Sequence, residues 1–280
     1  MSRSALITGT SSGIGLETAV ALAAAGFQVV ATMRDAARRN RLDARAAAAG
    51  VTLDVRELDV QSDASIRHCV ADVIDRYGQI DLLVNNAGAG YLGAMEQTTD
   101  AALQRVMDVN FFGVWRLTQA ILPSMRRAGS GRIISVTSIG GLLGQPFNDA
   151  YCASKFAVEG FMESLAPVAR RLGIHVSLIE PGAVHSEFVA SVMHTSEHLT
   201  PELQAAYGEM LNAYTTAASQ TYEMAGQTSA DVAACIAEVA VADTPHFRYQ
   251  TSDQIRGLVG RKYVDPTGDS VVAMSGARLP

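Results

Sequence analysis

Short apolar runs alternate with longer stretches of helical periodicity along most of the chain. The runs have the length of strands and lie at residues 5–7, 27–31, 51–58, 80–84, 132–136 and 174–179, with one more short strand expected at 246–250. The helical stretches lie at residues 16–25, 35–49, 64–77, 103–122, 151–172 and 230–241. Parallel strands need helical crossovers and are buried on both faces. The alternation therefore predicts an α/β fold with a doubly wound parallel sheet of seven strands.

The periodicity changes after Pro181. Residues 185–225 carry Leu, Met and Tyr at mostly helical spacings, with Thr, Ser and His between them. A helical hairpin over a cleft gives such a pattern, and so does an ordinary amphipathic helix packed on the core. No break in composition marks a second domain. We therefore expect a single domain over residues 1–280, in which residues 185–225 form a helical substrate lid.

Composition and charge narrow the class of protein. The 280 residues include 22 Lys and Arg against 28 Asp and Glu, and this net charge of −6 argues against a nucleic-acid partner. An apolar fraction of 48% is enough for a sizeable core. The apolar stretches are too short for a membrane span and the first residues do not resemble a secretory leader, so we expect a cytoplasmic protein with no membrane span. Three widely spaced cysteines predict neither disulfides nor a metal site.

A glycine-rich loop follows the first strand and opens into a helix. Glycines let the backbone approach a pyrophosphate closely, and the N-terminus of the following helix presents unpaired N–H groups and a positive dipole end to it. The position of the loop between a strand and a helix predicts a Rossmann-type dinucleotide site. The residues expected to contact the cofactor are Gly9, Ser11, Ser12, Gly13, Ile14 and Gly15.

The end of the second strand indicates which dinucleotide is bound. In such folds it faces the adenosine ribose, where a carboxylate suits the 2′-hydroxyl and an arginine suits a 2′-phosphate. Here Arg34 ends the strand with no carboxylate before it, and Ser11 is able to donate to the same phosphate. Asp35 follows, but as a helix N-cap it would direct its charge at backbone N–H groups. We therefore expect NADP(H) rather than NAD(H).

Several motifs resemble the short-chain dehydrogenase/reductase family. Besides the glycine loop they are Asp59-Val60, Asn85-Asn86-Ala87-Gly88, Ser138 and Tyr151-Cys152-Ala153-Ser154-Lys155, each directly after a predicted strand or at the start of a helix. Asn110 and Pro181-Gly182 also match positions of the family. The stretches 146–157, 177–180 and 265–268 resemble more narrowly the type 1 17β-hydroxysteroid and photoreceptor retinol dehydrogenases of that family. The similarity covers essentially the whole chain.

The resemblance implies further contacts and an assembly. Asp59 and Val60 would lie at the adenine, and Asn86, Ala87 and Gly88 would wall its pocket. On the nicotinamide side the implied contacts are Pro181, Gly182, Val184 and Ser186. The family often assembles through the helices that correspond to residues 103–122 and 151–172, so we expect a homodimer, with a tetramer as the alternative.

The chemistry of carbonyl reduction gives a role to each matching side chain. Hydride transfer leaves an alkoxide that must be protonated, and Tyr151 is expected as the general acid, or as the base in the reverse direction. A free phenol has a pKa of ~10, so a cation must stabilise its phenolate. Lys155 lies one helical turn later on the same face, and it is one of only two lysines beside twenty arginines. The resemblance further implies that Lys155 binds the nicotinamide ribose, that Ser138 holds the substrate oxygen, and that Asn110 holds a water beside Lys155.

The expected substrate is a bulky hydrophobic ketone, aldehyde or alcohol, steroid-like or retinoid-like. Its pocket is expected to include Ser138, Leu142, Leu143, Phe147, Asn148, Tyr151 and His185. For the residues that no motif contains, core packing is an equal explanation. His194 and His198 are spaced to share a metal on a helix, but no third ligand is evident and we expect no metal.

Two other functions stay open at this point. One is a reductase of 3-oxoacyl groups on a carrier protein, although such enzymes are usually shorter and lack so long an insert after Pro-Gly. The other is a non-catalytic NADP(H)-sensing regulatory protein. Such proteins commonly lose Ser, Tyr or Lys from the catalytic set, and all three are present here.

Overall fold

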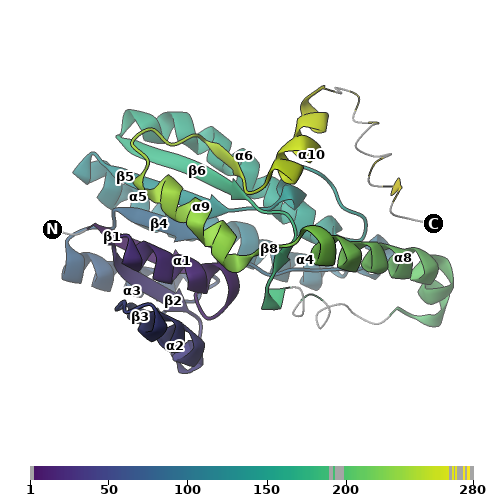
Figure 1. Ribbon diagram of the computed structural model, residues 1–280, viewed down its shortest axis with the longest axis horizontal. Coiled ribbons are helices and arrows are strands. Elements are labelled where there is room, and N and C mark those ends of the chain that lie inside the picture. Colours follow the sequence, from purple (N-terminus) through teal and green to yellow (C-terminus); the bar gives the residue numbers. More distant parts are fainter. Residues whose placement is uncertain are drawn as a thin grey trace.

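Seven parallel strands form one sheet through the middle of the protein (Figure 1). The computed structural model describes residues 3–188, 192, 199–264, 267, 269, 274, 276 and 277. In spatial order the strands are β3 (Asp54–Glu57), β2 (Gln28–Met33), β1 (Ser4–Thr8), β4 (Leu82–Asn85), β5 (Gly131–Val136), β6 (Ile174–Glu180) and β9 (Arg248–Gln250). The order reverses between β1 and β4, which is where open α/β sheets bind ligands at the carboxyl ends of their strands. The doubly wound seven-stranded sheet predicted from the sequence is confirmed.

Helices cover both faces of the sheet. On one face lie α1 (Gly13–Ala24), α2 (Asn40–Ala48) and α9 (Ser229–Val241), with α1 and α9 side by side (Figure 1). On the other lie α3 (Asp63–Tyr77), α5 (Gly113–Ala128) and α6 (Asp149–Arg171). Successive strand residues point to opposite faces, so Leu6 joins the core beneath α3 and α5 while Ala5 and Ile7 join the core beneath α1 and α9.

Two expected helices differ in detail from the prediction. The stretch expected at 103–122 runs as α4 (Asp100–Met107), a π-helical turn (Asp108–Phe112) and α5. The turn contains Asn110, whose side chain bonds to the backbone of Ala89 rather than to its own helix. The stretch expected at 35–49 begins with a 3₁₀ turn, η1 (Ala36–Arg39), because the Asp35 carboxylate caps it by accepting from the N–H of Ala37 at 2.9 Å.

The insert that follows β6 begins and ends at neighbouring positions in the fold. The short strand β7 (Val184–His185) pairs with β8 (Gln227–Thr228), and the long helix α8 (Pro201–Ala225) lies between them in the sequence. Figure 1 shows α8 projecting beyond the end of the sheet. Of the lid expected at residues 185–225, residues 189–191 and 193–198 lie outside the described residues. After β9, α10 (Asp253–Val264) packs above the carboxyl end of the sheet, and no described helix is long and apolar enough to cross a membrane.

Candidate functional site

The glycine loop is fixed by the strand next to it. Asn86, directly after β4, donates from its side-chain amide to the carbonyl oxygens of Thr8 at 2.9 Å and Gly9 at 3.1 Å. In return the Thr8 hydroxyl accepts from the backbone N–H groups of Asn86 and Ala87, both at 3.0 Å. Gly9 has φ +71°, and a Cβ there would lie 2.9 Å from the Cα of Ala87. These hydrogen bonds between the glycine loop and the loop after β4 hold the start of α1 so that its backbone N–H groups face a cavity.

The cavity has a volume of about 810 Å³ and lies at the carboxyl ends of the central strands. Its lining joins the glycine loop, the loops after β2, β4, β5 and β6, the start of α6 and parts of the lid. Most of the residues predicted to hold the cofactor line it, namely Gly9, Ser11, Ser12, Gly13, Ile14, Gly15, Arg34, Val60, Asn86, Ala87, Gly88, Tyr151, Lys155, Pro181, Gly182, Val184 and Ser186. Asp59 does not: its carboxylate accepts from the N–H of Gln61 at 3.0 Å, and Gln61 lines the cavity instead.

The end of the cavity next to β2 is positively charged. Arg34 and Arg38 line it, and neither has a carboxylate partner within the described part of the chain. Three other arginines of the same segment are paired, in the ion pairs Arg39–Asp43, Arg41–Glu187 and Arg45–Glu17. The two arginines that face the cavity are therefore the two left available for an anion.

The opposite end of the cavity carries Ser138, Tyr151 and Lys155. Ser138 follows β5, while Tyr151 and Lys155 lie one turn apart on α6. The Ser138 side chain lies beside Tyr151 and acts to lower the pKa of its phenol. The Lys155 Nζ lies 5.8 Å from the centroid of the Tyr151 ring and donates to the carbonyl oxygen of Val136 at 3.0 Å. The structure thus brings together, in the wall of the cavity, three of the four side chains that the sequence analysis assigned to catalysis.

Burial shifts the pKa of both titratable groups toward the neutral form. Desolvation raises the pKa of the Tyr151 phenol, and the hydrogen bond from Ser138 acts in the opposite direction. Desolvation lowers the pKa of Lys155 to about 8, against the opposing charge of Glu159. Lys155 is only 6% exposed, so water screens the charge of its ammonium little.

Asn110 lies behind this site rather than in its wall. Its Oδ1 accepts from the N–H of Ala89 at 2.7 Å, and its Nδ2 donates to the carbonyl oxygen of Ala89 at 2.8 Å and to the Ser154 hydroxyl at 2.9 Å. A Cβ on Gly88 would lie 3.5 Å from its Oδ1 and 3.7 Å from the Lys155 Nζ. The side chain therefore holds the loop after β4 against α6, next to Lys155.

The predicted substrate residues divide into two groups. Ser138, Asn148 and Tyr151 line the cavity, and the Asn148 side chain donates to the Tyr214 hydroxyl of α8 at 3.0 Å. The other four are not part of the lining. Leu142 and Leu143 are buried in an apolar cluster with Ile255 and Val259 of α10. Phe147, with φ +60°, packs on the Tyr214 ring, and His185 is exposed beside Tyr222.

Several lining residues were not among the individual site residues predicted from the sequence, although four of them lie within the expected lid at residues 185–225. Phe188 and Val192 of the lid lie against Gly90, and Tyr214 and Tyr222 face the cavity from α8. Gln254, Ile255 and Leu258 come from α10. A Cβ on Gly182 would lie 2.8 Å from Cγ1 of Ile255, so α10 packs directly against the loop after β6. The only local signal for this wall was the helical spacing of apolar residues 255, 258 and 259.

Other reactive side chains are placed away from this chemistry. Burial raises the pKa of the Cys152 thiol to about 11, so it is protonated at neutral pH and is a poor nucleophile. His194 and His198 lie outside the described residues, as do Asp265, Pro266 and Gly268. Within the residues that are described, no group of three or more His, Cys, Asp or Glu side chains is arranged to hold a metal.

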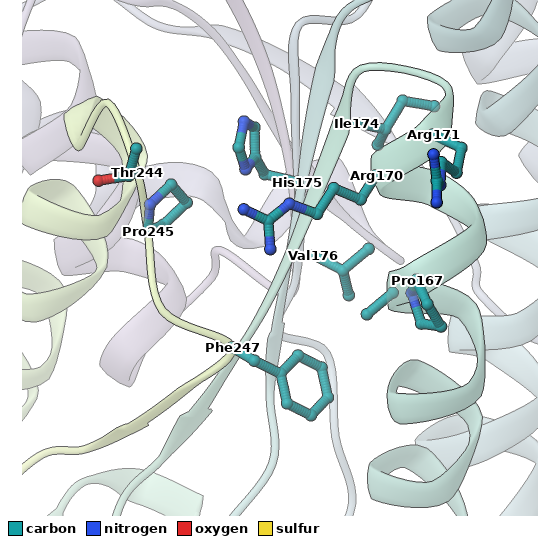
Figure 2. A pocket seen from close by; sticks show the side chains of 10 residues that line it. Pro167, Arg170, Arg171, Ile174, His175, Val176, Thr244, Pro245 and Phe247 are labelled. Carbon is teal, nitrogen blue, oxygen red and sulfur yellow. The ribbon is translucent and has the colours of Figure 1, made fainter.

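A second cavity of about 420 Å³ lies between the end of α6 and the start of β6. Figure 2 shows the Arg170 guanidinium directed from α6 toward His175, with Pro245 and Phe247 on the other side. Cations at a helix C-terminus offset its dipole, which accounts for Arg170 and Arg171. Desolvation and the charges of Arg132 and Arg170 lower the pKa of His175. None of these residues lines the first cavity.

Comparison with known proteins agrees with this geometry. The family model described as short chain dehydrogenase matches residues 3–197. The chain belongs to the short-chain dehydrogenase/reductase family. Retinol dehydrogenase 8 of Bos taurus is 42% identical over 282 aligned positions, which cover 98% of this chain and 89% of that protein. The 17-beta-hydroxysteroid dehydrogenase type 1 of Homo sapiens is 40% identical over 273 positions, which cover 95% of this chain and 83% of that protein.

A solved structure shows the same arrangement of strands and helices. A single-substitution variant of actinorhodin polyketide ketoreductase, solved with NADPH, superposes with a TM-score of 0.77 at 30% identity and covers 91% of this chain and 97% of its own. This short-chain dehydrogenase/reductase is accordingly an oxidoreductase, related to retinol and 17-beta-hydroxysteroid dehydrogenases.

Proposed function

We propose that this enzyme interconverts a bulky hydrophobic ketone or aldehyde and the corresponding alcohol, with NADP(H) as the hydride carrier. The observation that carries the proposal is the continuous cavity that joins the glycine loop at one end to Ser138, Tyr151 and Lys155 at the other. A dinucleotide laid along it would present its nicotinamide next to Tyr151.

The residues at the glycine-loop end fit such a cofactor. Side chains at Gly9 and Gly15 would collide with neighbouring backbone, so the loop keeps a bare backbone surface. Ser12, the N-cap of α1, makes no side-chain capping hydrogen bond, which leaves the first N–H groups of the helix available for a phosphate. Arg34 and Arg38, without carboxylate partners among the described residues, support the 2′-phosphate of NADP(H) over the 2′-hydroxyl of NAD(H).

The side chains at the other end supply the proton chemistry. The bound nicotinamide donates or accepts the hydride. In the reducing direction Ser138 donates a hydrogen bond to the substrate oxygen and Tyr151 transfers its phenolic proton to that oxygen. The ammonium of Lys155 stabilises the phenolate that remains, which burial alone would disfavour. In the oxidising direction the same phenolate takes the proton of the alcohol.

The walls around Tyr151 support a large apolar substrate. They include Tyr91, Leu92, Phe188, Val192, Tyr214, Tyr222, Ile255 and Leu258. Such a surface gains from excluding water around a hydrocarbon skeleton but offers few groups for a charged one. Together with the relatives named for retinol and hydroxysteroids, this supports a steroid-like or retinoid-like compound.

A cluster of exposed and half-buried aromatic side chains on the π-helical turn, α5 and α6 supports a homodimer. Phe112 and Trp115 are each 44% exposed, and the centroid of the Trp115 ring lies 4.6 Å from that of Phe161 on α6. Exposed aromatic clusters of this kind are typical of protein interfaces. We propose that two copies pair through this aromatic patch of Phe112, Trp115 and Phe161.

The direct test is a panel of steroids, retinoids and aromatic ketones, with consumption of NADPH followed by absorbance. We expect turnover of at least one compound by the wild-type enzyme and none by Tyr151→Phe, which should still bind NADPH as judged by quenching of Trp115 fluorescence. Equal turnover by Tyr151→Phe would show that another group is the acid. Turnover confined to 3-oxoacyl carrier proteins, or NADPH binding with no turnover at all, would favour one of the two alternative functions.

A further inference from the structure

We propose that Glu159 is a positioning residue for catalysis, holding the end of β5 in register with α6 and supplying the buried countercharge of Lys155. The inference rests on the proposed function, because it takes Tyr151 and Lys155 to be the proton-transfer pair. Glu159 belongs to none of the sequence motifs, does not line the cavity, and lies one further turn along α6.

Three consecutive residues at the end of β5, Val136, Thr137 and Ser138, contact three different turns of α6. The Val136 carbonyl accepts from Lys155 at 3.0 Å and the Thr137 hydroxyl donates to Glu159 Oε1 at 2.6 Å. The next residue, Ser138, lies beside Tyr151 and acts to lower its pKa. The three α6 residues are spaced four apart, so they lie on one face of the helix. The bond between Thr137 and Glu159 therefore sets the same register on which the relation of Ser138 to Tyr151 depends.

The carboxylate of Glu159 is buried and fully engaged. It is 4% exposed, its Oε1 accepts from Thr137, and its Oε2 accepts from the Arg248 Nε of β9 at 3.2 Å. A Cβ on Gly141 would lie 3.1 Å from its Cγ, so the Glu159 side chain packs closely against this glycine. A carboxylate this constrained positions the groups bonded to it instead of exchanging partners with water.

Titratable groups from four elements surround Glu159. On α6 these are Lys155 and Glu163, on β6 Glu180, on β9 Arg248, and on α10 Lys262 and Tyr263. Arg248 also pairs with Glu163 at 2.7 Å and with Glu180 at 3.2 Å. Burial raises the pKa of Glu159, whereas the bonds from Thr137 and Arg248 lower it and favour the ionised form. That ionised form in turn raises the pKa of Lys155 against the effect of burial.

The protein offers a direct readout, because Lys155 and Lys262 are its only lysines. Protein labelled with ¹³C-lysine gives two side-chain Cε signals, and Lys262→Arg assigns them. In the wild-type protein we expect Lys155 to titrate near pH 8. Glu159→Gln keeps an acceptor for Thr137 but removes the charge, and should lower that midpoint by roughly one pH unit. Glu163→Gln, which removes a solvent-exposed partner of the same Arg248, should leave it unchanged.

Kinetics with a ketone reduced by the wild-type enzyme test the consequence for catalysis. Glu159→Gln should lower kcat about tenfold and move the basic limb of its pH profile to lower pH, with KM little changed. Thr137→Val removes the hydrogen bond that holds β5 in register with α6 but keeps the charge of Glu159. It should therefore lower kcat without moving the basic limb of the pH profile. If Glu159→Gln does not fold, the Thr137→Val variant tests the register on its own. A kcat of Thr137→Val equal to that of the wild-type enzyme would overturn the proposal.

The outcomes separate this inference from the proposed function. A Lys155 midpoint unchanged in Glu159→Gln would overturn the countercharge role whether or not any substrate is known. A wild-type protein that reduces no carbonyl compound, while the Lys155 midpoint shifts as expected, would remove the proposed reaction and leave the charge relation intact.

Discussion

Gly15 lies so close to Asn86 that the two can be neighbours only because Gly15 has no side chain. A Cβ on Gly15 would collide with the Asn86 Nδ2 and would lie 3.0 Å from the carbonyl carbon of Gly9. Asn86 is the residue that fixes the glycine loop. A methyl group added at Gly15 would therefore occupy space next to Asn86 and also displace the loop.

We therefore expect Gly15→Ala to raise the Kd for NADPH at least about tenfold, because overpacking a rigid site costs about 1–3 kcal/mol. Fluorescence titration measures this. Gly160→Ala is the matched control: its Cβ would meet nothing within 4 Å, and binding should be unchanged. Unimpaired binding by Gly15→Ala would mean that the phosphates lie elsewhere.

Arg34 should determine the choice of dinucleotide. We expect the wild-type kcat/KM with NADPH to exceed that with NADH by more than about tenfold, and the ratio to collapse in Arg34→Ala because a charge-assisted contact to phosphate is lost. Arg38→Ala should reduce it in part. Arg39→Ala, whose side chain is paired with Asp43, is the control that should leave the ratio as it was. An equal ratio in wild type and Arg34→Ala would exclude this role.

Lys155→Arg keeps the charge and should still lose most activity, roughly a hundredfold in kcat. Lys155 is 6% exposed and bonded to Val136, so a planar guanidinium would not fit in the same position. Lys262→Arg provides the comparison, since Lys262 lies over the Phe156 ring away from the cavity and its replacement should leave kcat unchanged. Assays at matched NADPH saturation distinguish a loss of chemistry from a loss of cofactor.

Glu180 should make the stability of the protein depend on pH. It is 0% exposed, and burial together with the charge of Glu159 raises its pKa to about 7 from an ordinary 4.5. The folded state therefore holds a proton that the unfolded state releases, and this stabilising contribution is present below pH 4.5 and lost as pH rises through about 7.

Glu180→Gln should accordingly raise Tm more at pH 8 than at pH 5, because the amide has no charge to desolvate. Thermal unfolding followed by circular dichroism at both pH values measures the difference. Asp253→Asn, an exposed carboxylate on α10, should show no such trend. A Tm difference independent of pH would contradict the raised pKa.

The aromatic patch on α5 and α6 should carry the dimer. Trp115→Glu places a charge among Phe112 and Phe161 and should convert a dimeric mass into a monomeric one by light scattering. Met95→Glu, at an even more exposed apolar residue outside the patch, should remain dimeric. A monomeric wild-type protein would refute the proposed assembly.

The sequence predicted those features whose signal is local. Strands buried on both faces appear as short apolar runs, and the positive φ of Gly9 and Gly13 requires glycine, so both the sheet and the phosphate loop could be located. Tyr151 and Lys155 share a helix face and were therefore paired correctly in space. Family resemblance added Ser138, which no periodicity would have identified.

The features that were missed depend on tertiary packing. Leu142 and Leu143 follow Ser138 closely, yet the 3₁₀ turn after it directs them to α10 instead of the cavity. Ile255 reaches the nicotinamide side only because β9 pairs with β6 and carries α10 over the sheet end. Asp59 was expected at the adenine; its carboxylate accepts from the N–H of Gln61, and it is Gln61 that lines the cavity.

The position of Arg248 on the last strand has a consequence for how the protein is made. Its guanidinium pairs with Glu159 and Glu180, which are 4% and 0% exposed, yet it is translated after both of them. Until β9 is added beside β6, a chain that has folded only β1 to β6 lacks the cation that pairs with these two acids in the complete fold. The charges of Glu159 and Glu180 would therefore be balanced only after residue 248 has been synthesised and β9 has joined the sheet. Completion of the sheet thus precedes the final electrostatic state of the active site.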